Sequence, residues 1–467
     1  MKRIAPVFCL FTFAFCLFLS SCKKDSFITS EFAQVRITSD TLKYDTVFTT
    51  TGSITKSFKI INENSQKLRL SKVKLMGGAA SAYKMNVDGA ATNEVTNLDI
   101  EANDSIYVFV SVTINPNAAN LPFIVSDSIL INYNGNNRYV QLQSYGQNAN
   151  FLRNRLITGN VVWTNNLPYV ILGSILIDTT ASLTIQPGCR IYSHADAPFI
   201  VDGTLIVNGT KANPIAFAGD RLDEGYKDLP ASWPGIYFRE TSVNNTLQFA
   251  VIKNAYQGIV AESPSQNAAP KVVLNQCVID NSYDAGILGA QSSIQASNCL
   301  VSNCGKNIVL GYGGSYAFTH CTAASFSNDL IAHVSPVLSV SNYVLQGNAL
   351  VTSDLTANFV NCIFWGNNGN VEDEVVVSRQ GSTAFTVNLS NCLWKVKNSP
   401  ADVSAVTIIS NSDPLFDSVN TSRRYYDFHL KAGSPAINKG IPTALTQDLD
   451  GNTRAVGLPD LGCYERQ

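Results

Sequence analysis

The sequence predicts an all-β chain in which a small antiparallel β-sandwich precedes a β-helix. Asn, Ser, Thr, Val and Ile are abundant across the 467 residues and long helical runs are absent, which favours strands joined by polar turns. The central part repeats one pattern: apolar, x, apolar, two residues, Cys, x, apolar. A fixed period of roughly 20–25 residues built from strand-like pieces is typical of a solenoid. The residues at the Cys position are Cys277, Cys299, Cys321, Tyr343, Cys362 and Cys392.

Residues 1–21 are expected to be a lipoprotein signal peptide. Lys2 and Arg3 form a positive start, and an apolar stretch follows that is too short to favour a spanning helix. Residues 19–22, Leu-Ser-Ser-Cys, match a lipobox, so we expect Cys22 to carry lipid and residues 22–32 to act as a tether. An ordinary secretory signal followed by a chance cysteine is the alternative. Acyl chains would anchor the protein to a membrane without a span, and the outer membrane, at its periplasmic or surface face, is the expected location.

Residues 33–148 lack the Cys-marked repeat. Stretches such as Ser57–Ile61 and Ile106–Val110 alternate apolar and polar residues, and turn-prone links such as Asn134-Gly135-Asn136 separate them. About seven short strands in this length predict a β-sandwich. The order, which closes on Ser144-Tyr145-Gly146, resembles immunoglobulin-like modules of bacterial surface proteins.

Residues 149–412 are predicted to form the β-helix. Short alternating strands such as Gly173–Ile177 and Gly203–Gly209 open it, and the Cys-marked coils follow. A single coil cannot bury its apolar face, whereas stacked coils share one core. Positions −5, −3 and +2 from each Cys position should point inward, as for Val272, Leu274 and Ile279, or for Leu338, Val340 and Leu345 beside Tyr343. Ala250 fits the Cys position one coil earlier, and Asn254, Asn281 and Asn303 fit tight corners.

The eight cysteines after Cys22 are predicted to be free thiols. Stacked coils place equivalent residues about 4.8 Å apart with parallel Cβ vectors, which suits a disulfide poorly. Cysteine then acts as a small buried apolar residue. No CxxC motif or Cys/His pair at metal spacing occurs, so structural zinc is not expected.

Residues 413–467 carry a second set of motifs. They include Asp427-Phe428-His429-Leu430, Ser434-Pro435-Ala436-Ile437, Asp448-Leu449-Asp450-Gly451 and Asp460–Glu465. This series, with the Cys-marked coils before it, resembles a family of bacterial right-handed parallel β-helix repeat lipoproteins, most of them of unassigned function. The resemblance implies a fold and an exported location but no reaction. Because a solenoid has open ends, we expect this segment to cover one of them.

The charge pattern offers one candidate metal site. The net charge is −2 and 15% of residues are charged, so a nucleic-acid partner is not expected. The one dense acidic stretch lies in a loop and would suit calcium, although its interleaved Arg221 and Lys227 also fit a solvated loop. Its carboxylates are Asp220, Asp223, Glu224 and Asp228. No other cofactor is expected.

Two tryptophans are candidates for glycan contact. Trp365 lies three residues after Cys362, a position that should face outward, and Trp233 begins a coil near the acidic loop. Exposed aromatic rings on an elongated face stack well on sugar rings. The alternative is that Trp233 packs beneath the inserted loop.

Three functions stay open from the sequence. The first is a non-catalytic envelope protein whose β-helix binds a polysaccharide or a surface protein. The second is a polysaccharide lyase or glycoside hydrolase, which needs carboxylates or a basic residue at the same coil position on neighbouring coils. Asp280, Asp284 and Lys306 come nearest to that requirement. The third is an adhesin or scaffold, and no catalytic residue is assigned.

Overall fold

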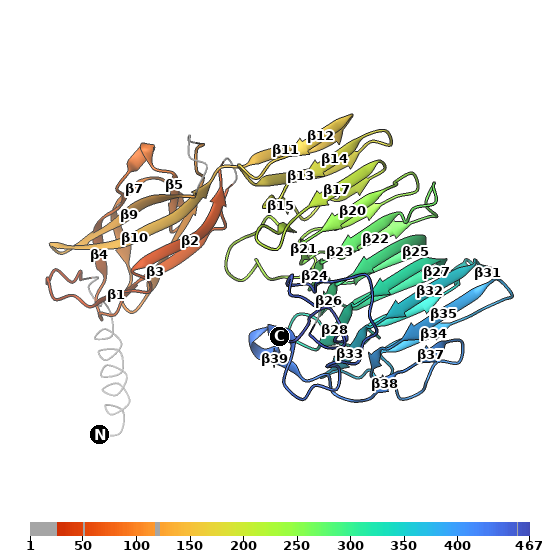
Figure 1. Ribbon diagram of the computed structural model, residues 1–467. Coiled ribbons are helices and arrows are strands. Elements are labelled where there is room, and N and C mark those ends of the chain that lie inside the picture. The colour runs from red at the N-terminus through yellow and green to blue at the C-terminus, as the bar shows by residue number, and fades with distance from the viewer. Residues whose placement is uncertain (1–25, 50–51, 117–121, 455) are drawn as a thin grey trace, which may run out of the picture. The chain divides into compact units, whose positions relative to one another are not determined.

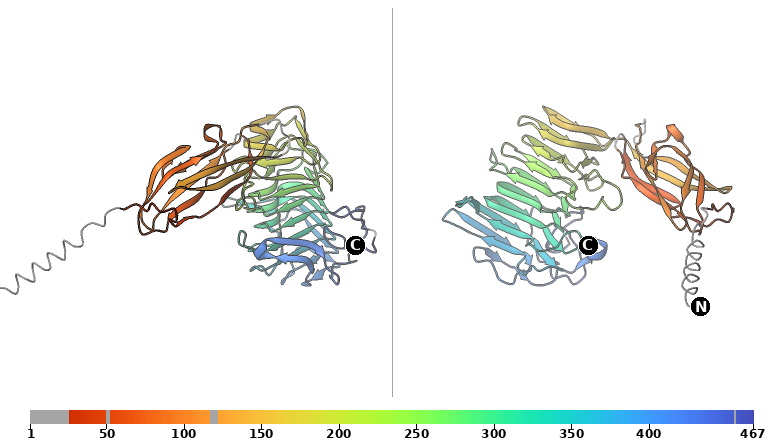
Figure 2. Two further views of the ribbon diagram at one scale, coloured as in Figure 1. Left: turned by 90° about the vertical axis from the view of Figure 1, so that its left-hand side faces the viewer. Right: turned by 180° about the vertical axis from the view of Figure 1, so that it is seen from behind.

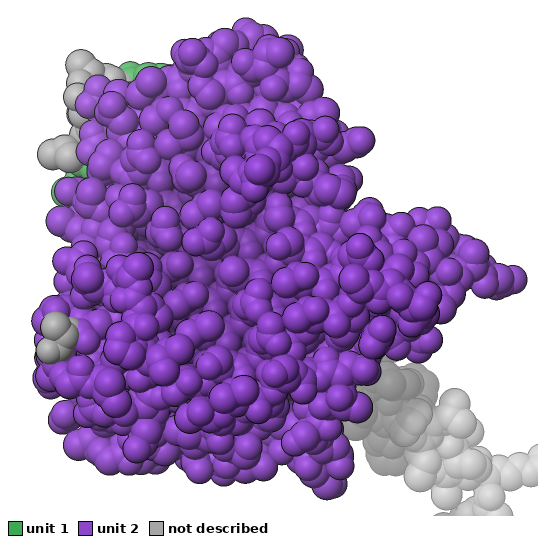
Figure 3. All heavy atoms as spheres, turned by 45° about the vertical axis from the view of Figure 1, so that its right-hand side comes forward, with its two compact units in different colours: residues 1–148 green, residues 149–467 purple. Residues whose placement is uncertain are grey.

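The computed structural model describes residues 26–49, 52–116, 122–454 and 456–467. The described chain is built almost wholly of strands, which confirms the predicted all-β class. It divides into two compact units, residues 1–148 and 149–467 (Figure 3). The predicted signal peptide and Cys22 lie outside the described residues. Within those residues, no helix combines the length and apolar character needed to cross a membrane.

The first unit is a sandwich of two five-stranded sheets. Alternating side chains of both sheets point into one core; Phe58, Val108 and Leu70 are fully buried there. All pairings are antiparallel except that of β2 with β10, which is parallel. One sheet contains β1 (Val35–Ile37), β3 (Lys56–Asn62), β8 (Ser105–Val112), β5 (Tyr83–Val87) and β6 (Ala90–Ala91). The other contains β2 (Thr41–Phe48), β10 (Asn136–Gln147), β9 (Phe123–Tyr133), β4 (Leu68–Leu75) and β7 (Glu94–Ile100). A short 3-10 turn, η1, spans Gly78–Ala80.

The second unit is a parallel β-helix whose 26 strands stack as successive coils (Figures 1 and 2). The pairing register divides the strands into three faces, and four long strands bend from one face to the next. These four are β11 (Asn150–Ile157), β13 (Tyr169–Ile177), β25 (Ala285–Ser297) and β27 (Lys306–Thr319). Each coil runs through face I, then face II, then face III.

The remaining strands belong to one face each. Face I has β16 (Phe199–Val201), β19 (Ile236–Phe238), β22 (Gln257–Glu262), β29 (Leu338–Ser341) and β34 (Val375–Ser378). Face II has β12 (Asn160–Trp163), β14 (Ser182–Ile185), β17 (Thr204–Asn208), β20 (Asn245–Gln248), β23 (Val272–Asn275), β32 (Leu355–Val360), β35 (Phe385–Ser390) and β37 (Ser404–Val406). Face III has β15 (Arg190–Ser193), β18 (Ile215–Gly219), β21 (Ala250–Lys253), β24 (Val278–Asp280), β26 (Leu300–Ser302), β28 (Thr322–Phe326), β33 (Ile363–Asn367), β36 (Leu393–Trp394) and β38 (Ile409–Ser410).

The cysteines of the repeat form an inward column between faces II and III. Each is at most 1% exposed and stays a free thiol, as predicted. Each thiol donates to the carbonyl two residues before it, as Cys299 Sγ does to Ser297 O at 3.2 Å. The register extends the column back to Ala250, as predicted, and further to Ile215 and Cys189. Burial raises the pKa of Cys277 well above the usual thiol range.

Tyr343 does not belong to this column, which corrects the sequence-based prediction. Strand β28 pairs directly with β33, so Cys321 is followed in the stack by Cys362. Tyr343 instead begins β30 (Tyr343–Gln346), which forms an antiparallel hairpin with β31 (Ala349–Thr352). Leu345, predicted to point inward, is 66% exposed. The coil between the two cysteines is therefore one long coil with an inserted hairpin.

Corner residues in the left-handed conformation allow the coils to turn. The predicted corners Asn254, Asn281 and Asn303 have φ of 61°, 57° and 50°. Asparagine tolerates this region because its short side chain bonds to nearby backbone. A second column of left-handed corners precedes the cysteines: Gln276, Asn298, His320, Asn361 and Asn391.

The C-terminal segment lies along the side of the β-helix, which corrects the prediction that it covers an open end (Figure 1). Its apolar side chains, such as Phe428 and Leu461, pack on the outer side of face III, where they cover Phe326, Ile363 and Leu393. It contains β39 (Phe416–Asn420), the 3-10 turn η2 (Thr421–Arg423) and β40 (Tyr425–Leu430). The corner column binds its backbone, because the side chains of Gln276, Asn298, Asn361 and Asn391 donate to carbonyls between residues 439 and 448.

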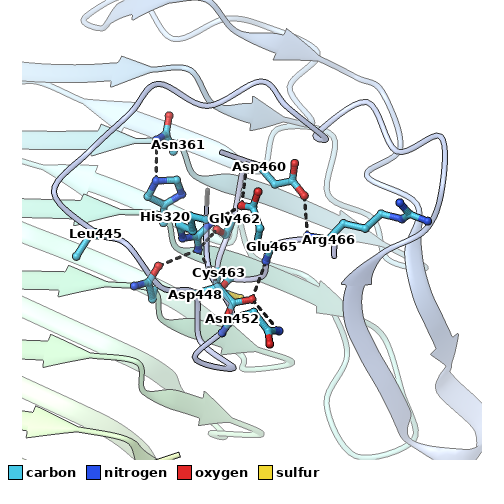
Figure 4. Close-up of polar contacts among 12 residues, drawn as sticks. His320, Asn361, Leu445, Asp448, Asn452, Asp460, Gly462, Cys463, Glu465 and Arg466 are labelled. Carbon is cyan, nitrogen blue, oxygen red and sulfur yellow. Dashed lines mark hydrogen bonds and ion pairs between the residues drawn. The ribbon is translucent and has the colours of Figure 1, made fainter. Parts of the chain in front are cut away.

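Buried polar residues secure the end of this segment (Figure 4). Arg454 is 5% exposed and donates to Glu465 Oε2 at 3.1 Å and to Asn298 Oδ1 at 2.8 Å. Burial raises the pKa of Glu465 to about 7. Burial also lowers the pKa of His320 to about 3, so this histidine is neutral. Gly451 forms a turn with φ of 78°, and Asp448 Oδ1 accepts from Asn452 N at 2.7 Å.

Candidate functional site

Neither tryptophan predicted to contact glycan is accessible. Trp365 does point out of the β-helix, but the C-terminal segment covers it and only 7% of the residue is exposed. Trp233 is 1% exposed in the core, and its Nε1 donates to Lys253 O at 2.8 Å. Neither ring therefore offers an exposed face to a sugar in this structure, and Trp233 instead packs in the core.

The acidic loop does not gather its carboxylates around one point. Asp220 pairs with His194 at 2.8 Å, Asp223 with Arg221 at 2.8 Å, and Glu224 with Lys227 at 2.7 Å. Asp228 lies elsewhere, in a cleft described below. No group of three or more His, Cys, Asp or Glu residues in the described chain is arranged to hold a metal ion. The four carboxylates of the predicted calcium site therefore do not converge, since Asp223 and Glu224 each pair with a different basic residue and Asp228 lines the cleft.

The carboxylate and lysine residues weighed for catalysis form structural pairs across coils. Lys306 Nζ lies 3.0 Å from Asp284 Oδ1, whose second oxygen accepts from Gln257 Nε2 at 2.8 Å. Asp280 is the register partner of Lys253, and their charged atoms are 3.5 Å apart. These pairs place a carboxylate beside a lysine on neighbouring coils, but each carboxylate is already bonded within the chain.

A groove lies on the outer side of face II. It has a volume of about 530 Å³, and it spans three successive coils. Its floor comes from the second halves of β25 and β27 and from β32, which pair in register. The loop 264–270 forms a wall, and Ser353 and Asp354 also line the groove. We call this site the face II groove.

The floor presents uncharged polar side chains in aligned columns. Residues such as Tyr316 on β27 and Phe359 on β32 point into the core. Because side chains alternate along a strand, the neighbouring residues on each strand point out of the β-helix. Adjacent coils are about 4.8 Å apart, so the first column repeats a hydroxyl group at that interval, while Ala317 interrupts the amides of the second. One column is Ser293, Ser315, Thr356 and Thr386; the next is Gln295, Ala317, Asn358 and Asn388.

Hydrogen bonds orient the amides of the second column. Asn388 Nδ2 donates to Asn358 Oδ1 at 2.8 Å. This bond uses the Asn358 oxygen and the Asn388 nitrogen, so the Asn358 amide nitrogen is left as a donor and the Asn388 oxygen as an acceptor. Gln295, on the preceding coil, is exposed. The arrangement suits a ligand that offers hydroxyl groups, because hydroxyls both donate and accept.

A buried lysine fixes the wall loop. Lys271 directly follows the loop and is fully buried; its ammonium donates to the carbonyls of Arg239, Glu240 and Glu262 at 2.9, 3.0 and 2.6 Å. Burial lowers its pKa to about 8. Its backbone N–H donates to Ser293 Oγ at 2.8 Å, which ties the wall to the floor.

The corner beneath the groove requires glycine. Gly314 has φ of +116°, and a Cβ there would lie 2.3 Å from the carbonyl oxygen of Ser292 on the previous coil. The close approach of the two coils at this turn from face I to face II therefore leaves no room for a side chain. Tyr316 closes this corner from inside, with its hydroxyl accepting from Ser292 N at 3.2 Å and donating to Gly313 O at 3.0 Å.

The groove carries little charge. Asp354 is the one ionisable group among its lining residues, apart from the buried tyrosine Tyr316, and Asp354 Oδ1 accepts from Ala384 N at 2.9 Å. Hydrolysis of a glycosidic bond normally uses two carboxyl groups on either side of the bond, and this lining offers one. The geometry of the groove suits binding better than acid–base chemistry.

Sequence reasoning missed the face II groove. Its floor residues include Ser, Thr, Asn and Gln, and on a single strand such residues indicate only a solvent-exposed position. The signal that could have found it is the register: the outward positions −4 and −6 from Cys299, Cys321, Cys362 and Cys392 carry hydroxyl or amide groups in all but one case.

Comparisons with known proteins identify no family. No protein-family model and no curated protein matches the chain. Among solved structures, the catalytic unit of a GH87 alpha-1,3-glucanase from Streptomyces thermodiastaticus is similar over 76% of this chain and 88% of its own, at 10% identity and a TM-score of 0.25.

Two further structures are similar over shorter stretches. A family 123 glycoside hydrolase from Clostridium perfringens covers 28% of this chain, at 13% identity and a TM-score of 0.20, and the match spans only 30% of that hydrolase. A PapD-like domain of human CEP192 covers 27% of this chain and 97% of its own, at 9% identity and a TM-score of 0.17. We draw no functional conclusion from likenesses this remote.

Proposed function

We propose that this chain is a lipid-anchored envelope protein that binds a neutral, chain-like glycan in the face II groove without cleaving it. The observation that carries the proposal is the pair of in-register columns of hydroxyl and amide groups on the groove floor. A glycan is a polymer of similar units, so a surface that repeats its hydrogen-bonding groups from coil to coil can contact successive sugars in the same way.

The low charge of the lining supports a neutral ligand. Burying a charged group without a partner is costly, whereas hydroxyls exchange water for amides and other hydroxyls at little cost. Loop 264–270 gives the groove a fixed wall, and preformed sites spend less free energy on ordering when they bind. A surface protein is the alternative ligand, and the same experiment separates the two.

The binding test uses residues 26–467 and a panel of neutral and acidic polysaccharides in affinity electrophoresis. The expected result is retardation by at least one neutral polymer, with no new reducing ends and no unsaturated products. Gln295→Ala with Asn358→Ala should abolish the retardation, while Gln141→Ala, an exposed amide on β10, should leave it unchanged. New chain ends would instead establish a lyase or hydrolase, and retention by no polysaccharide would overturn glycan binding.

The membrane anchor has its own test. The lipobox at residues 19–22 supports lipidation of Cys22, which would tether the protein to the outer membrane. A Cys22→Ser variant should lose incorporation of labelled fatty acid and move from the membrane fraction to the soluble fraction. Unchanged incorporation in the variant would refute the anchor.

A further inference from the structure

A second cleft lies at the corner between faces III and I, and it differs from the face II groove in its chemistry. It holds about 180 Å³ and is formed by three parts of the chain that are distant in sequence. These are the loop that carries Asp228, the corner residues Asn254 and Asn281, and the C-terminal hairpin with Arg424 and Tyr426. We call this site the corner cleft.

The cations of the corner cleft are weakly neutralised. Lys253 is 3.5 Å from Asp280, and Arg424 is 3.6 Å from the exposed Asp329. Arg423 makes no ion pair among the described residues. Asp280 is engaged further, because its Oδ1 accepts from Ser302 Oγ at 2.7 Å. Three cationic side chains therefore converge on the cleft with capacity left for an anion.

The loop that carries Asp228 supplies an acceptor to the cleft. Asp228 lines the cleft, and its backbone carbonyl accepts from Asn281 Nδ2 at 2.9 Å, which fixes the loop in place. Asn254 Nδ2 holds the same loop by donating to Lys227 O at 2.7 Å. A simple inorganic anion would gain nothing from the Asp228 carboxylate, whereas a molecule with both a carboxylate and hydroxyls could use both the cations and this acceptor.

Two exposed tyrosines follow the corner residues on the same coils. Tyr256 comes two residues after Asn254, and Tyr283 two residues after Asn281. Their rings stack across neighbouring coils with centroids 5.9 Å apart, and 45% and 55% of the residues remain exposed. An exposed aromatic pair gives a flat surface on which the apolar face of a sugar ring can lie.

We propose that the corner cleft binds an acidic sugar, that is, a pyranose that carries a carboxylate, and that the Tyr256–Tyr283 pair, which follows the corner residues on the same coils, contacts the neighbouring ring. The carboxylate pairs with Arg423, Arg424 and Lys253, the hydroxyls donate to Asp228, and the next ring stacks on the tyrosines. This site stands on different residues from the face II groove and does not depend on it. The protein would thus hold a neutral and an acidic saccharide on separate faces of one β-helix.

The test measures binding of a tetrasaccharide of galacturonic acid and of its methyl-esterified, uncharged form to residues 26–467 by titration calorimetry. The acidic form should bind at least tenfold more tightly, since hydrogen bonds to a charged group are the stronger ones. Raising the salt concentration should weaken it. Equal binding of both forms, or none of the acidic form, would overturn the proposal.

Variants locate the site. Arg423→Glu and Lys253→Gln should each weaken binding of the acid by about tenfold or more, and Tyr256→Ala with Tyr283→Ala by a similar factor. The matched controls are Arg155→Ala on β11 and Tyr139→Ala on β10, both exposed, which should change nothing. Melting temperatures of all variants show whether each is folded.

Substitutions at one site should leave ligand binding at the other site unchanged. Gln295→Ala with Asn358→Ala should leave the acidic ligand bound, and the corner variants should leave the neutral ligand bound. If folded Arg423→Glu binds the acid as tightly as the unaltered chain does, the corner cleft is not the site. If the groove variant loses the acid as well, the two saccharides share one site and this proposal is wrong.

Discussion

Replacing Lys271 by methionine should destabilise the β-helix and remove a distinct pH dependence. The ammonium of Lys271 is fully buried and serves three carbonyls at 2.6–3.0 Å. Methionine fills a similar volume but donates nothing, so three partly buried carbonyls lose this donor. Such groups cost about 1–3 kcal/mol each when left unsatisfied. The variant avoids the cost of burying a charge, which offsets part of that loss, and we expect a net loss of about 2–4 kcal/mol.

The pH dependence follows from the direction of the pKa shift. The pKa of Lys271 falls from its usual value of 10.5 to about 8 on burial. Between these values the unfolded chain binds the proton and the folded chain does not, so the stability of the folded state rises with pH across this window. Lys271→Met has no such proton, and its stability curve should lack this rise.

Urea unfolding followed by tryptophan fluorescence measures both effects. The four tryptophans, Trp163, Trp233, Trp365 and Trp394, all lie in the second unit, so the signal reports on the β-helix alone. The difference in unfolding free energy between the two proteins should be largest at pH 10. A variant that unfolds at the same urea concentration as the unaltered chain, at pH 7 and at pH 10, would refute this reasoning.

Two further predictions concern the C-terminal segment. Trp365→Ala should lower the free energy of unfolding by about 3–5 kcal/mol and expose residues 413–467 to limited proteolysis. Binding of glycan in the face II groove should stay unchanged. Loss of binding with stability intact would restore Trp365 as a sugar contact. Because burial raises the pKa of Glu465 from 4.5 to about 7, its contribution to stability is fully present below pH 4.5 and is lost as the pH rises through 7. Glu465→Gln should flatten this decline in hydrogen exchange of residues 448–467 between pH 5 and 8, and an unchanged decline would show that another group titrates.

The repeat made the stacking direction of most coils predictable from sequence. The spacing of the cysteines sets the coil length, and the apolar positions around Cys277 or Cys299 are buried as expected. The prediction for Tyr343 failed because strands of face I and face II show the same alternation of apolar and polar residues. Leu338 and Val340 are indeed buried, but on face I, and a local pattern cannot tell which face a strand joins.

The candidate sites depended on contacts that no local pattern contains. The outward position of Trp365 was predicted, but its burial results from a segment more than fifty residues further along the chain. The columns of the face II groove exist only once the register aligns Gln295 with Asn358 through Ala317. Long-range register, rather than residue type, decides where these side chains meet.

The dependence of affinity on ligand length tests the central claim most directly. Titration calorimetry would compare neutral oligosaccharides of one to six units, drawn from whichever polymer the chain retains. Affinity should rise with each added unit until the ligand spans the coils that line the groove, and Asn358→Ala should flatten the rise. A single sugar that binds as tightly as the hexasaccharide would contradict a groove that repeats its contacts from coil to coil.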